Sequence, residues 1–325
     1  MSRLPIAVDA MGGDKAPGEI VEGAARAAEE VGEVVLVGRP EELGTDHGLA
    51  VVPASEVIAM DADPGSSVRR MKDSSLVRAA EAVRDGKASA IVSAGNTGAT
   101  MASALLRMGR IKGVARPAIA TPIPVPGGTP TVLLDAGANA ECQPQWLVQF
   151  AQMGAVFARE RYGVTRPRVG LLSIGEEASK GNPLVKETFP LLAEAELAGE
   201  FVGNVEGRDI MTDDVDVVVT DGFTGNVALK TLEGGLKALV NALFAVFGAT
   251  DEAKAAADVL MPQLLPLYAE LDPDSYGGAM LLGVDGVCII SHGSSSATAV
   301  VNAVRVAAEM VDHGVVDKLR TAVTA

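Results

Sequence analysis

Polar side chains that can bind an anion recur in a series of glycine-rich turns, each of which follows an apolar run. These turns carry Asn96, Asn139, Lys180, Asn226 and His292. Glycine lets backbone N–H groups approach an anion closely, and the N-terminus of a following helix adds its positive dipole end. Taken singly, such a turn is also typical of an ordinary tight loop. Taken together, the turns predict a polar site for a phosphate-like group.

The elements that position these turns are short strands and helices in alternation. We expect strands at 6–8, 34–37, 90–92, 131–134, 169–172, 215–219 and 286–290, with helices at 19–31, from 98 to about 108, and up to about 311. This alternation indicates an α/β fold with a mostly parallel sheet covered on both faces. Ligands bind beyond the carboxyl ends of such strands, so we expect the turns to gather at one edge. The Pro- and Gly-rich segment 117–130 is interpreted as extended chain and turns, with a hinge between halves as the alternative.

Three residues in or beside the turns each have a structural alternative. Lys180 can pair with phosphate as a point charge, or with Glu176 or Glu177 as a solvated loop residue. His292 directly follows a strand, where catalytic groups sit in open α/β sheets, although an isolated His is more often structural. Cys288 lies within the strand and is interpreted as a small buried hydrophobe.

Composition excludes several classes of function. The 325 residues carry a net charge of −15, which argues against general nucleic-acid binding because a phosphate backbone needs a basic face. The sequence contains neither a P-loop nor a G-x-G-x-x-G fingerprint, so a triphosphatase and a Rossmann dehydrogenase are disfavoured. Two Cys and three His give no zinc spacing. We expect no metal, a reducing cytoplasm, no signal peptide and no membrane span.

An apolar stripe marks a helical face over residues 236–247, in the chain that follows the turn at 220–226. Its members follow helical spacing: Leu236, Leu239, Val240, Leu243, Phe244 and Phe247. The pattern favours burial in the core or in a dimer interface, and the alternative is a protruding helical pair that touches a membrane surface.

Eight segments, in order along nearly the whole chain, resemble the phosphate acyltransferase family of phospholipid synthesis, the PlsX family. Two dipeptides, Ala16–Pro17 and Lys180–Gly181, extend the first and fifth of these matches. The segments are 6–14 (IAVDAMGGD), 66–75 (SSVRRMKDSS), 93–99 (SAGNTGA), 134–139 (LDAGAN), 170–177 (GLLSIGEE), 221–226 (DGFTGN), 276–279 (YGGA) and 292–293 (HG).

The resemblance implies a function and a fold. The family moves a fatty acyl group from acyl carrier protein to inorganic phosphate, giving an acyl phosphate for glycerol-phosphate acylation, without a redox cofactor or an obligatory metal. Its fold is a three-layer α/β/α sandwich like that of isocitrate and isopropylmalate dehydrogenases and of phosphotransacetylase. Over residues 1–325 the resemblance implies one domain, a homodimer, and a helical tip at about 236–274. In some members that tip binds the membrane peripherally, next to the downstream glycerol-phosphate acyltransferase.

The chemistry assigns roles to the turn residues. Phosphate attacks the thioester carbonyl and a thiolate leaves, so the protein must hold an anion and stabilise an oxyanion. We expect Lys180 and Asn226 on the phosphate or the oxyanion, and His292 to position or deprotonate the phosphate. Asp9, Asp14 and Asp221 have the alternative of a metal or of helix capping, which is the simpler interpretation. The remaining polar pocket is expected from Asp9, Gly12, Gly13, Asp14, Ser93, Asn96, Thr97, Asn139, Asp221, Thr224 and Gly225.

Charge is unevenly distributed along the chain. Residues 66–116 carry ten basic and three acidic residues, net +7, which predicts a docking segment for an acidic carrier protein. The expected tip departs from the family pattern, since 236–275 carries two Lys against six acids, net −4. Any membrane contact there rests on apolar burial.

Three rival functions remain open. A transferase that uses coenzyme A thioesters would share the anion-binding turns. A decarboxylating dehydrogenase of the same fold would need a metal-binding Asp set and an adenosine site, and neither is evident. A membrane-surface scaffold would use the apolar helix but would leave the polar turns unexplained.

Overall fold

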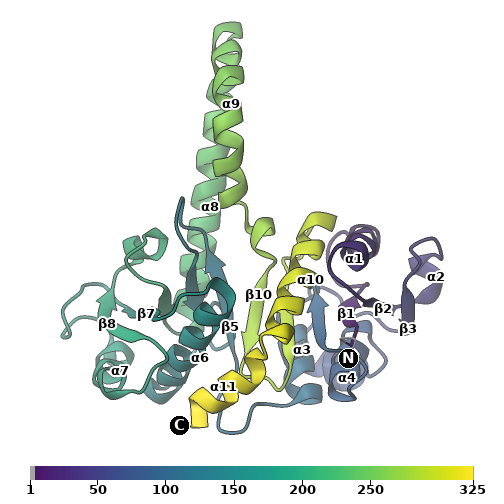
Figure 1. Ribbon diagram of the computed structural model, residues 1–325, viewed down its shortest axis with the longest axis horizontal. Coiled ribbons are helices and arrows are strands. Elements are labelled where there is room, and N and C mark those ends of the chain that lie inside the picture. The colour runs from purple at the N-terminus through teal and green to yellow at the C-terminus, as the bar shows by residue number, and fades with distance from the viewer. Residues whose placement is uncertain (1–3, 325) are drawn as a thin grey trace.

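An eleven-stranded sheet runs through the whole molecule (Figure 1). The computed structural model describes residues 4–324. The strand order is β3-β2-β1-β4-β11-β10-β5-β6-β9-β7-β8. The strands are β1 (Ile6–Asp9), β2 (Val34–Gly38), β3 (Ala50–Pro53), β4 (Ala90–Ser93), β5 (Ala118–Ile123), β6 (Thr131–Leu134), β7 (Arg168–Leu172), β8 (Glu200–Val205), β9 (Val217–Val219), β10 (Ala279–Leu282) and β11 (Val287–Ile290).

Helices cover both faces of the sheet, which confirms the predicted α/β class. The α-helices are α1 (Gly18–Glu30), α2 (Pro40–Leu43), α3 (Pro64–Arg70), α4 (Ser75–Arg84), α5 (Thr97–Ser103), α6 (Pro144–Tyr162), α7 (Pro183–Glu194), α8 (Gly222–Phe247), α9 (Asp251–Leu271), α10 (Ala297–Asp312) and α11 (Val315–Thr324). A π-helical turn, η1 (Ala104–Met108), continues α5, and two 3₁₀ turns are η2 (Gly207–Met211) and η3 (Pro273–Tyr276).

Successive side chains along each strand point to opposite faces of the sheet, so a hydrophobic core lies on each face. Ile6 and Val8 point into a core shared with α1, α6, α7, α10 and α11. Ala7, on the opposite side of the same strand, packs in a core with α3, α4 and α5. Both cores are rich in Val, Ile, Leu and Ala, as expected for a sheet buried on both faces.

The expectation of one edge for all the turns is wrong. Strands β1, β4 and β11 are parallel, but β10 is antiparallel to both β11 and β5, and β5 is antiparallel to β6. Because these three pairings reverse the direction, β6, β9, β7 and β8 run opposite to β4 and β11. The turns after β1, β4 and β11 therefore lie at one edge of the sheet, and those after β6, β7 and β9 at the other.

Strand β5 lies within the segment interpreted as extended chain and turns. Its proline, Pro122, pairs with Val132 of β6, beyond the part of β5 that pairs with β10. Proline has no N–H to donate, so it is tolerated where a strand has a partner on one side only. The proline-rich chain thus contributes a central strand rather than a loop between halves.

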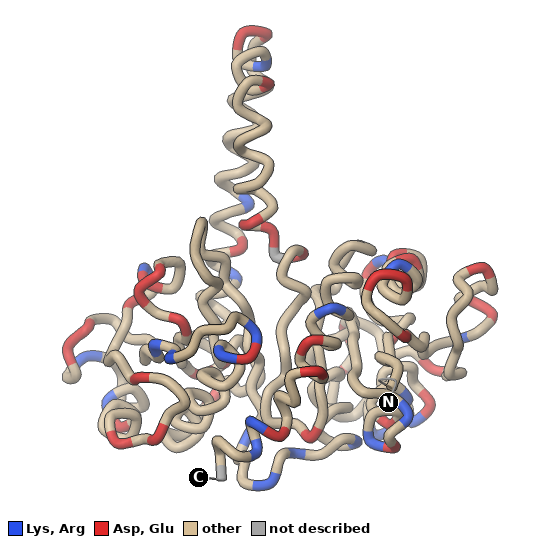
Figure 2. Tube along the Cα trace, in the orientation of Figure 1, with Lys and Arg blue, Asp and Glu red and all other residues tan. Residues whose placement is uncertain are grey.

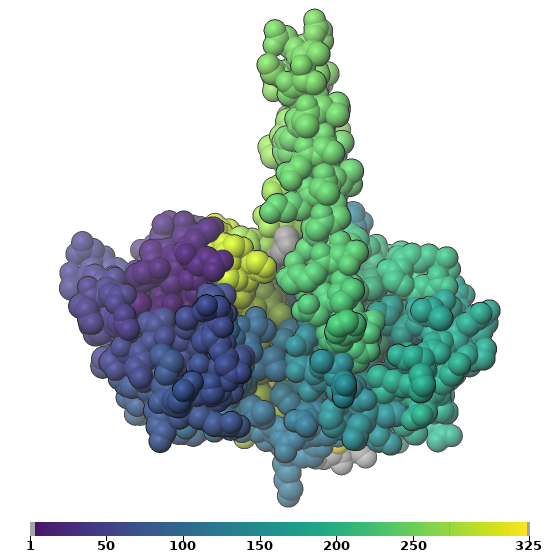
Figure 3. Space-filling view, turned by 180° about the vertical axis from the view of Figure 1, so that it is seen from behind, coloured from purple at the N-terminus to yellow at the C-terminus, as the bar shows by residue number. Residues whose placement is uncertain are grey.

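Helices α8 and α9 project from the body as an antiparallel pair, which we term the hairpin (Figures 1 and 3). Its middle is free of charge, since residues 238–250 and 259–269 contain no Asp, Glu, Lys or Arg, whereas acidic residues cluster at the far end (Figure 2). Leu239 and Val259 are 57% and 73% exposed. Within this chain the apolar stripe is therefore not buried in the core, contrary to one of the two favoured interpretations.

Candidate active site

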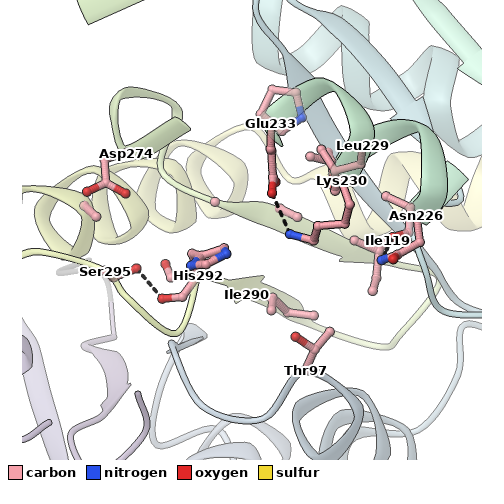
Figure 4. Close-up of a pocket in the computed structure, with 17 residues that line it drawn as sticks. Thr97, Ile119, Asn226, Leu229, Lys230, Glu233, Asp274, Ile290, His292 and Ser295 are labelled. Atoms are coloured by element: carbon pink, nitrogen blue, oxygen red, sulfur yellow. Dashed lines mark hydrogen bonds and ion pairs between the residues drawn. The ribbon is translucent and has the colours of Figure 1, made fainter. Parts of the chain in front are cut away.

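A cleft of about 180 Å³ lies against one face of the central strands, between the N-terminus of α5 and the first half of α8 (Figure 4). Its floor is formed by β5, the start of β10 and the end of β11. Apolar side chains from these elements and from α8 line the floor and one wall: Ile119, Pro122, Leu229, Ala279 and Ile290. Polar residues lie toward both ends, so the cleft offers an apolar surface beside hydrogen-bonding groups.

His292 lies at the end of the cleft where β11 stops. Its Nδ1 is 2.8 Å from the Ser294 hydroxyl, and the Ser294 backbone N–H points to the same nitrogen at 3.3 Å. A backbone N–H can only donate, so Nδ1 acts as the acceptor and the neutral ring carries its proton on Nε2. The exposed ring can therefore donate a hydrogen bond from Nε2 to an anion.

Asn226 lies at the other end of the cleft, in the first turns of α8. Its amide Nδ2 donates to the Ala136 carbonyl at 3.1 Å, which fixes the amide and leaves a second N–H. Asp221 caps α8 by accepting from the Thr224 N–H at 2.8 Å, and the Thr224 hydroxyl donates to the same carboxyl at 2.8 Å. Capping is therefore confirmed for Asp221.

Close backbone packing sets the position of Asn226. A Cβ on Gly225 would lie 2.0 Å from the carbonyl oxygen of Asp135, and one on Gly222 would lie 2.7 Å from that of Asn139. These glycines let α8 begin directly against the turn after β6. Gly225 is therefore needed for the close packing of α8 against this turn. The sequence pattern alone does not distinguish that role from anion binding.

The turn after β6 is organised by a buried carboxylate that was not among the candidates. The Asp135 carboxyl accepts from the backbone N–H groups of Ile119, Gly137, Ala138 and Asn139, and from the Asn139 side chain at 2.9 Å. Burial raises the pKa of Asp135, and these donors oppose that shift. Asn139 also donates to the Pro117 carbonyl at 2.8 Å, so one amide hydrogen is engaged within the turn and the other ties the turn to the chain before β5.

Asp9 and Ser93 form a second buried polar pair, at the edge where β1 and β4 end. The Ser93 hydroxyl donates to Asp9 at 2.7 Å and accepts from the Gly95 N–H at 3.0 Å. Asp9 is 2% exposed, and burial raises its pKa. Helix capping is therefore the wrong interpretation of Asp9, because its partners are the side chains of Ser93 and Ser75 and the Met11 N–H, and Ser75, the first residue of α4, bonds it through its side chain rather than its backbone N–H.

Residues of the turn after β1 make room for Asp9 and contact the turn that follows β11. A Cβ on Gly12 would lie 2.5 Å from an Asp9 carboxyl oxygen, so the glycine makes room for the buried carboxylate. Asp14 donates its backbone N–H to the Gly293 carbonyl at 2.7 Å, and Gly13 has φ of +116°, a left-handed conformation that favours glycine. These contacts join the turn after β1 to the turn that carries His292.

Asn96 and Thr97 are adjacent but have different roles, since Asn96 stabilises the scaffold and Thr97 lines the cleft. The Asn96 side chain caps α5 by accepting from the Ala99 N–H at 2.9 Å, and it donates to the Met60 carbonyl at 2.7 Å. Thr97, the first residue of α5, lines the cleft. Of the candidates, Thr97, Asn226 and His292 thus line one cleft, although they come from opposite edges of the sheet.

Lys180 lies in the turn after β7, on the same edge of the sheet as the start of α8. Its side chain is exposed and is not among those that line the cleft. Of the two predicted alternative partners, Glu176 pairs with Arg208 at 3.3 Å, and Glu177 accepts the Lys180 backbone N–H through its carbonyl at 2.9 Å. Within the described residues Lys180 makes no ion pair, so its ammonium is available to a ligand or to solvent.

Three charged residues of the cleft were missed by sequence reasoning. Lys230 and Glu233 on α8 form an ion pair at 2.8 Å, and Asp274 in η3 lines the opposite side near His292 (Figure 4). The signal available was spacing, because Asn226, Lys230 and Glu233 follow one another at i, i+4 and i+7 along one face of a helix.

The remaining polar groups give no metal centre. Among residues 4–324, no group of three or more His, Cys, Asp or Glu is placed to hold a metal ion. Cys288 is fully buried, as predicted, and burial raises the pKa of its thiol to about 12. Burial, with the nearby Asp135 charge, also raises the pKa of Cys142 to about 12. Within the same residues, no helix has the length and apolar character needed to cross a membrane.

The basic segment 66–116 contains both paired and unpaired cations. Glu81 pairs with Arg78 at 3.4 Å and with Arg84 at 3.6 Å. Arg69 and Lys72, at and just beyond the end of α3, form no ion pair with a described residue. Helix α3 packs against α5, so these two cations lie on an element adjacent to the cleft wall.

The chain matches known proteins over nearly its whole length. A family model described as "Fatty acid synthesis protein" matches residues 4–318. The chain is 51% identical to the phosphate acyltransferase of Elusimicrobium minutum over 98% of this chain and 95% of that protein. It is 49% identical to the phosphate acyltransferase of Pelotomaculum thermopropionicum, with the same coverage of both chains.

Solved structures show a similar fold at low sequence identity. A phosphotransacetylase from Streptococcus pyogenes superimposes with a TM-score of 0.63 and 18% identity, over 95% of this chain and 94% of that one. A 4-hydroxythreonine-4-phosphate dehydrogenase from Klebsiella pneumoniae gives 0.55 and 14%, over 95% and 99%. At these identities the likeness concerns the fold alone.

Proposed function

The chain belongs to the phosphate acyltransferase family and is an acyltransferase, and on that premise we propose that it transfers a fatty acyl group from acyl carrier protein to inorganic phosphate. The products are an acyl phosphate, for use in phospholipid synthesis, and the free carrier thiol. The observation that carries the proposal is the cleft, in which an apolar floor runs between Asn226 at one end and His292 at the other.

The reaction needs positioning more than strong acid or base. A phosphate oxygen forms a bond to the thioester carbon, the carbonyl becomes an oxyanion, and the carbon–sulfur bond breaks to release a thiolate. The free N–H of Asn226 stabilises the oxyanion, and Lys180, from the turn after β7 at the same edge of the sheet, adds its positive charge from outside the cleft lining. His292 donates from Nε2 to a phosphate oxygen and so orients the nucleophile. The apolar floor holds the first carbons of the acyl chain.

Partner contacts are assigned on charge and exposure. Arg69 and Lys72, which form no ion pair among the described residues although Arg69 lies near the Asp63 carboxylate, attract the acidic carrier protein to the cleft. The fold is of the isocitrate and isopropylmalate dehydrogenase kind, and the hairpin is its helical tip. Two copies form a homodimer in the cytoplasm. The uncharged middle of the hairpin touches the membrane surface, where the acyl phosphate meets its glycerol-phosphate acyltransferase.

An assay without added metal tests the proposed reaction. The protein is incubated with a long-chain acyl-acyl carrier protein, with and without inorganic phosphate, and the free carrier thiol and the hydroxylamine-trapped acyl phosphate are measured. We expect both products in equal amounts, and only with phosphate. Thiol release that does not depend on phosphate contradicts the transfer, and activity only with coenzyme A thioesters selects a different acyl donor.

A further inference from the structure

Lys230 carries the one full positive charge among the described residues that line the cleft. Its Nζ is 2.8 Å from the Glu233 carboxyl, and the two side chains are 49% and 30% exposed. Lys230 lies one helical turn beyond Asn226 on the same face of α8, and the close-up shows it between Asn226 and Glu233 (Figure 4). Its ammonium is therefore next to the group assigned to the oxyanion.

An anion that enters this cleft meets an unfavourable balance of charge. Two carboxylates, Glu233 and Asp274, line the cleft against the single ammonium. His292 offers a neutral N–H, and Asp274 already accepts from the Ser296 hydroxyl at 3.0 Å. A phosphate dianion therefore needs the Lys230 charge, and Glu233 competes for that charge.

Two donors in the cleft have capacity left for a ligand. An ammonium has three N–H groups, and Lys230 uses one of them on Glu233. Ser291, beside His292, is 5% exposed and lines the cleft, and its hydroxyl has no hydrogen-bond partner among the described residues. A buried hydroxyl without a partner is costly unless a ligand or water satisfies it, which marks this end of the cleft as a site that receives a polar group.

We propose that Lys230 and Ser291 bind the phosphate substrate, and that Glu233 weakens this binding by holding the same ammonium. The inference rests on the proposed transfer to phosphate and adds a binding cation to the roles given to Lys180, Asn226 and His292. An exposed ion pair at i, i+3 that only supported the helix would stabilise it slightly, and loss of either partner would then have the same effect. If the ammonium binds phosphate, loss of the Lys230 charge weakens phosphate binding, whereas loss of the Glu233 charge strengthens it.

Variants of Lys230, Glu233 and Ser291 distinguish a phosphate-binding role from a purely structural one. Inorganic phosphate binding to the full-length protein is measured by titration calorimetry, and the KM values for phosphate and for the acyl donor are measured in the thiol-release assay. We expect Lys230→Met to raise the phosphate Kd and KM at least tenfold, Glu233→Gln to lower both severalfold, and Ser291→Ala to raise both by a smaller factor. The KM for the acyl donor stays unchanged. Lys237→Met, an exposed lysine two turns further along α8 that does not line the cleft, is the matched control.

The outcomes distinguish this inference from the proposed function. Thiol release by the wild type, with an unchanged phosphate KM in Lys230→Met, overturns the inference alone. Shifts in the same direction for Lys230→Met and Glu233→Gln also overturn it. Lys230-dependent phosphate binding without phosphate-dependent thiol release supports the binding site and overturns the acyl transfer. Circular dichroism melting curves confirm that each variant is folded.

Discussion

His292 gains its orientation from a neighbour two residues along the chain. The Ser294 N–H and hydroxyl both meet Nδ1, which leaves Nε2 as the nitrogen offered to the cleft. Sequence reasoning assigned His292 to positioning or to deprotonation of phosphate. The hydrogen-bond pattern supports positioning, because a ring that carries its proton on Nε2 donates there.

The first prediction concerns the candidate catalytic residues. We expect Lys180→Ala, Asn226→Ala and His292→Ala each to lower turnover about 10²-fold, the scale of a lost oxyanion or proton-transfer partner. The three side chains are exposed, so melting temperatures should stay close to that of the wild type. Steady-state assays of thiol release provide the measurement, with the exposed Lys186→Ala on α7 as the control. Turnover near that of the wild type would remove a residue from its role.

The second prediction concerns the two cysteines. Burial raises the pKa of both thiols to about 12, so at pH 8 the reactive thiolate is a small fraction of either. We expect slow modification by an aromatic disulfide reagent in the native protein, with a rate for Cys142 that rises about tenfold per pH unit. In denaturant, both thiols should react fully, because unfolding returns the pKa to about 8.5. Rapid reaction of one equivalent at pH 8 would contradict the raised pKa of Cys142.

At the scale of elements, α8 links the far edge of the sheet to the cleft and to the hairpin. It begins at Gly222, directly after its cap Asp221, lines the cleft at Leu229 and continues beyond the body to Phe247. Its glycines have two different environments. A Cβ on Gly225 would meet the Asp135 carbonyl, whereas a Cβ on Gly234 or Gly235 would meet no described atom within 4 Å apart from the adjoining helix backbone.

The third prediction uses this contrast within one helix. Gly225→Ala should destabilise the protein by about 2 kcal/mol or more, because α8 must move away from the turn after β6. The movement should also lower turnover by displacing Asn226. Gly235→Ala fills open space in a helix interior and should stabilise by about 0.5–1 kcal/mol. Chemical denaturation gives both values, and equal effects of the two variants would contradict the packing argument.

At the scale of the whole molecule, the hairpin exposes large apolar side chains outside both cores. Leu243, Phe244 and Leu260 are 44%, 49% and 47% exposed, in a band without charged residues. Exposed apolar surface of this kind is typical of an interaction site. The four net negative charges of 236–275 give no attraction to anionic lipid.

The fourth prediction tests the proposed membrane contact. In vesicle flotation, we expect binding to zwitterionic vesicles to be at least as strong as binding to anionic vesicles, since burial rather than charge supplies the free energy. The double variant Leu243→Ala, Leu260→Ala should float less. Leu106→Ala, which removes a leucine that is 49% exposed on the body, should float like the wild type. Absence of flotation with either lipid would contradict the membrane contact.

Local sequence determined seven of the eleven strands, the helices that directly follow several polar turns, and many of the turns themselves. The apolar runs before Asp9, Ser93 and His292 are strands, and helices follow in the predicted places, because periodicity and glycine-rich turns act over a few residues. The ordered motifs also determined the family. Strands β3, β5, β8 and β10 were not predicted: β5 contains a proline, β8 is interrupted by Gly203 and Asn204, and β3 and β10 are short runs without clear alternation.

Only the tertiary structure decided how the turns meet. Strand direction depends on which distant segments pair, and the antiparallel positions of β10 and β5 reverse one half of the sheet. As a result Asn226 and His292 come from opposite edges yet line one cleft, while Asp9, Asn96 and Asn139 hold the scaffold behind it. The spacing of Lys230 and Glu233 places them on the helix face of Asn226, but only the placement of α8 and η3 shows that this face and Asp274 line the cleft.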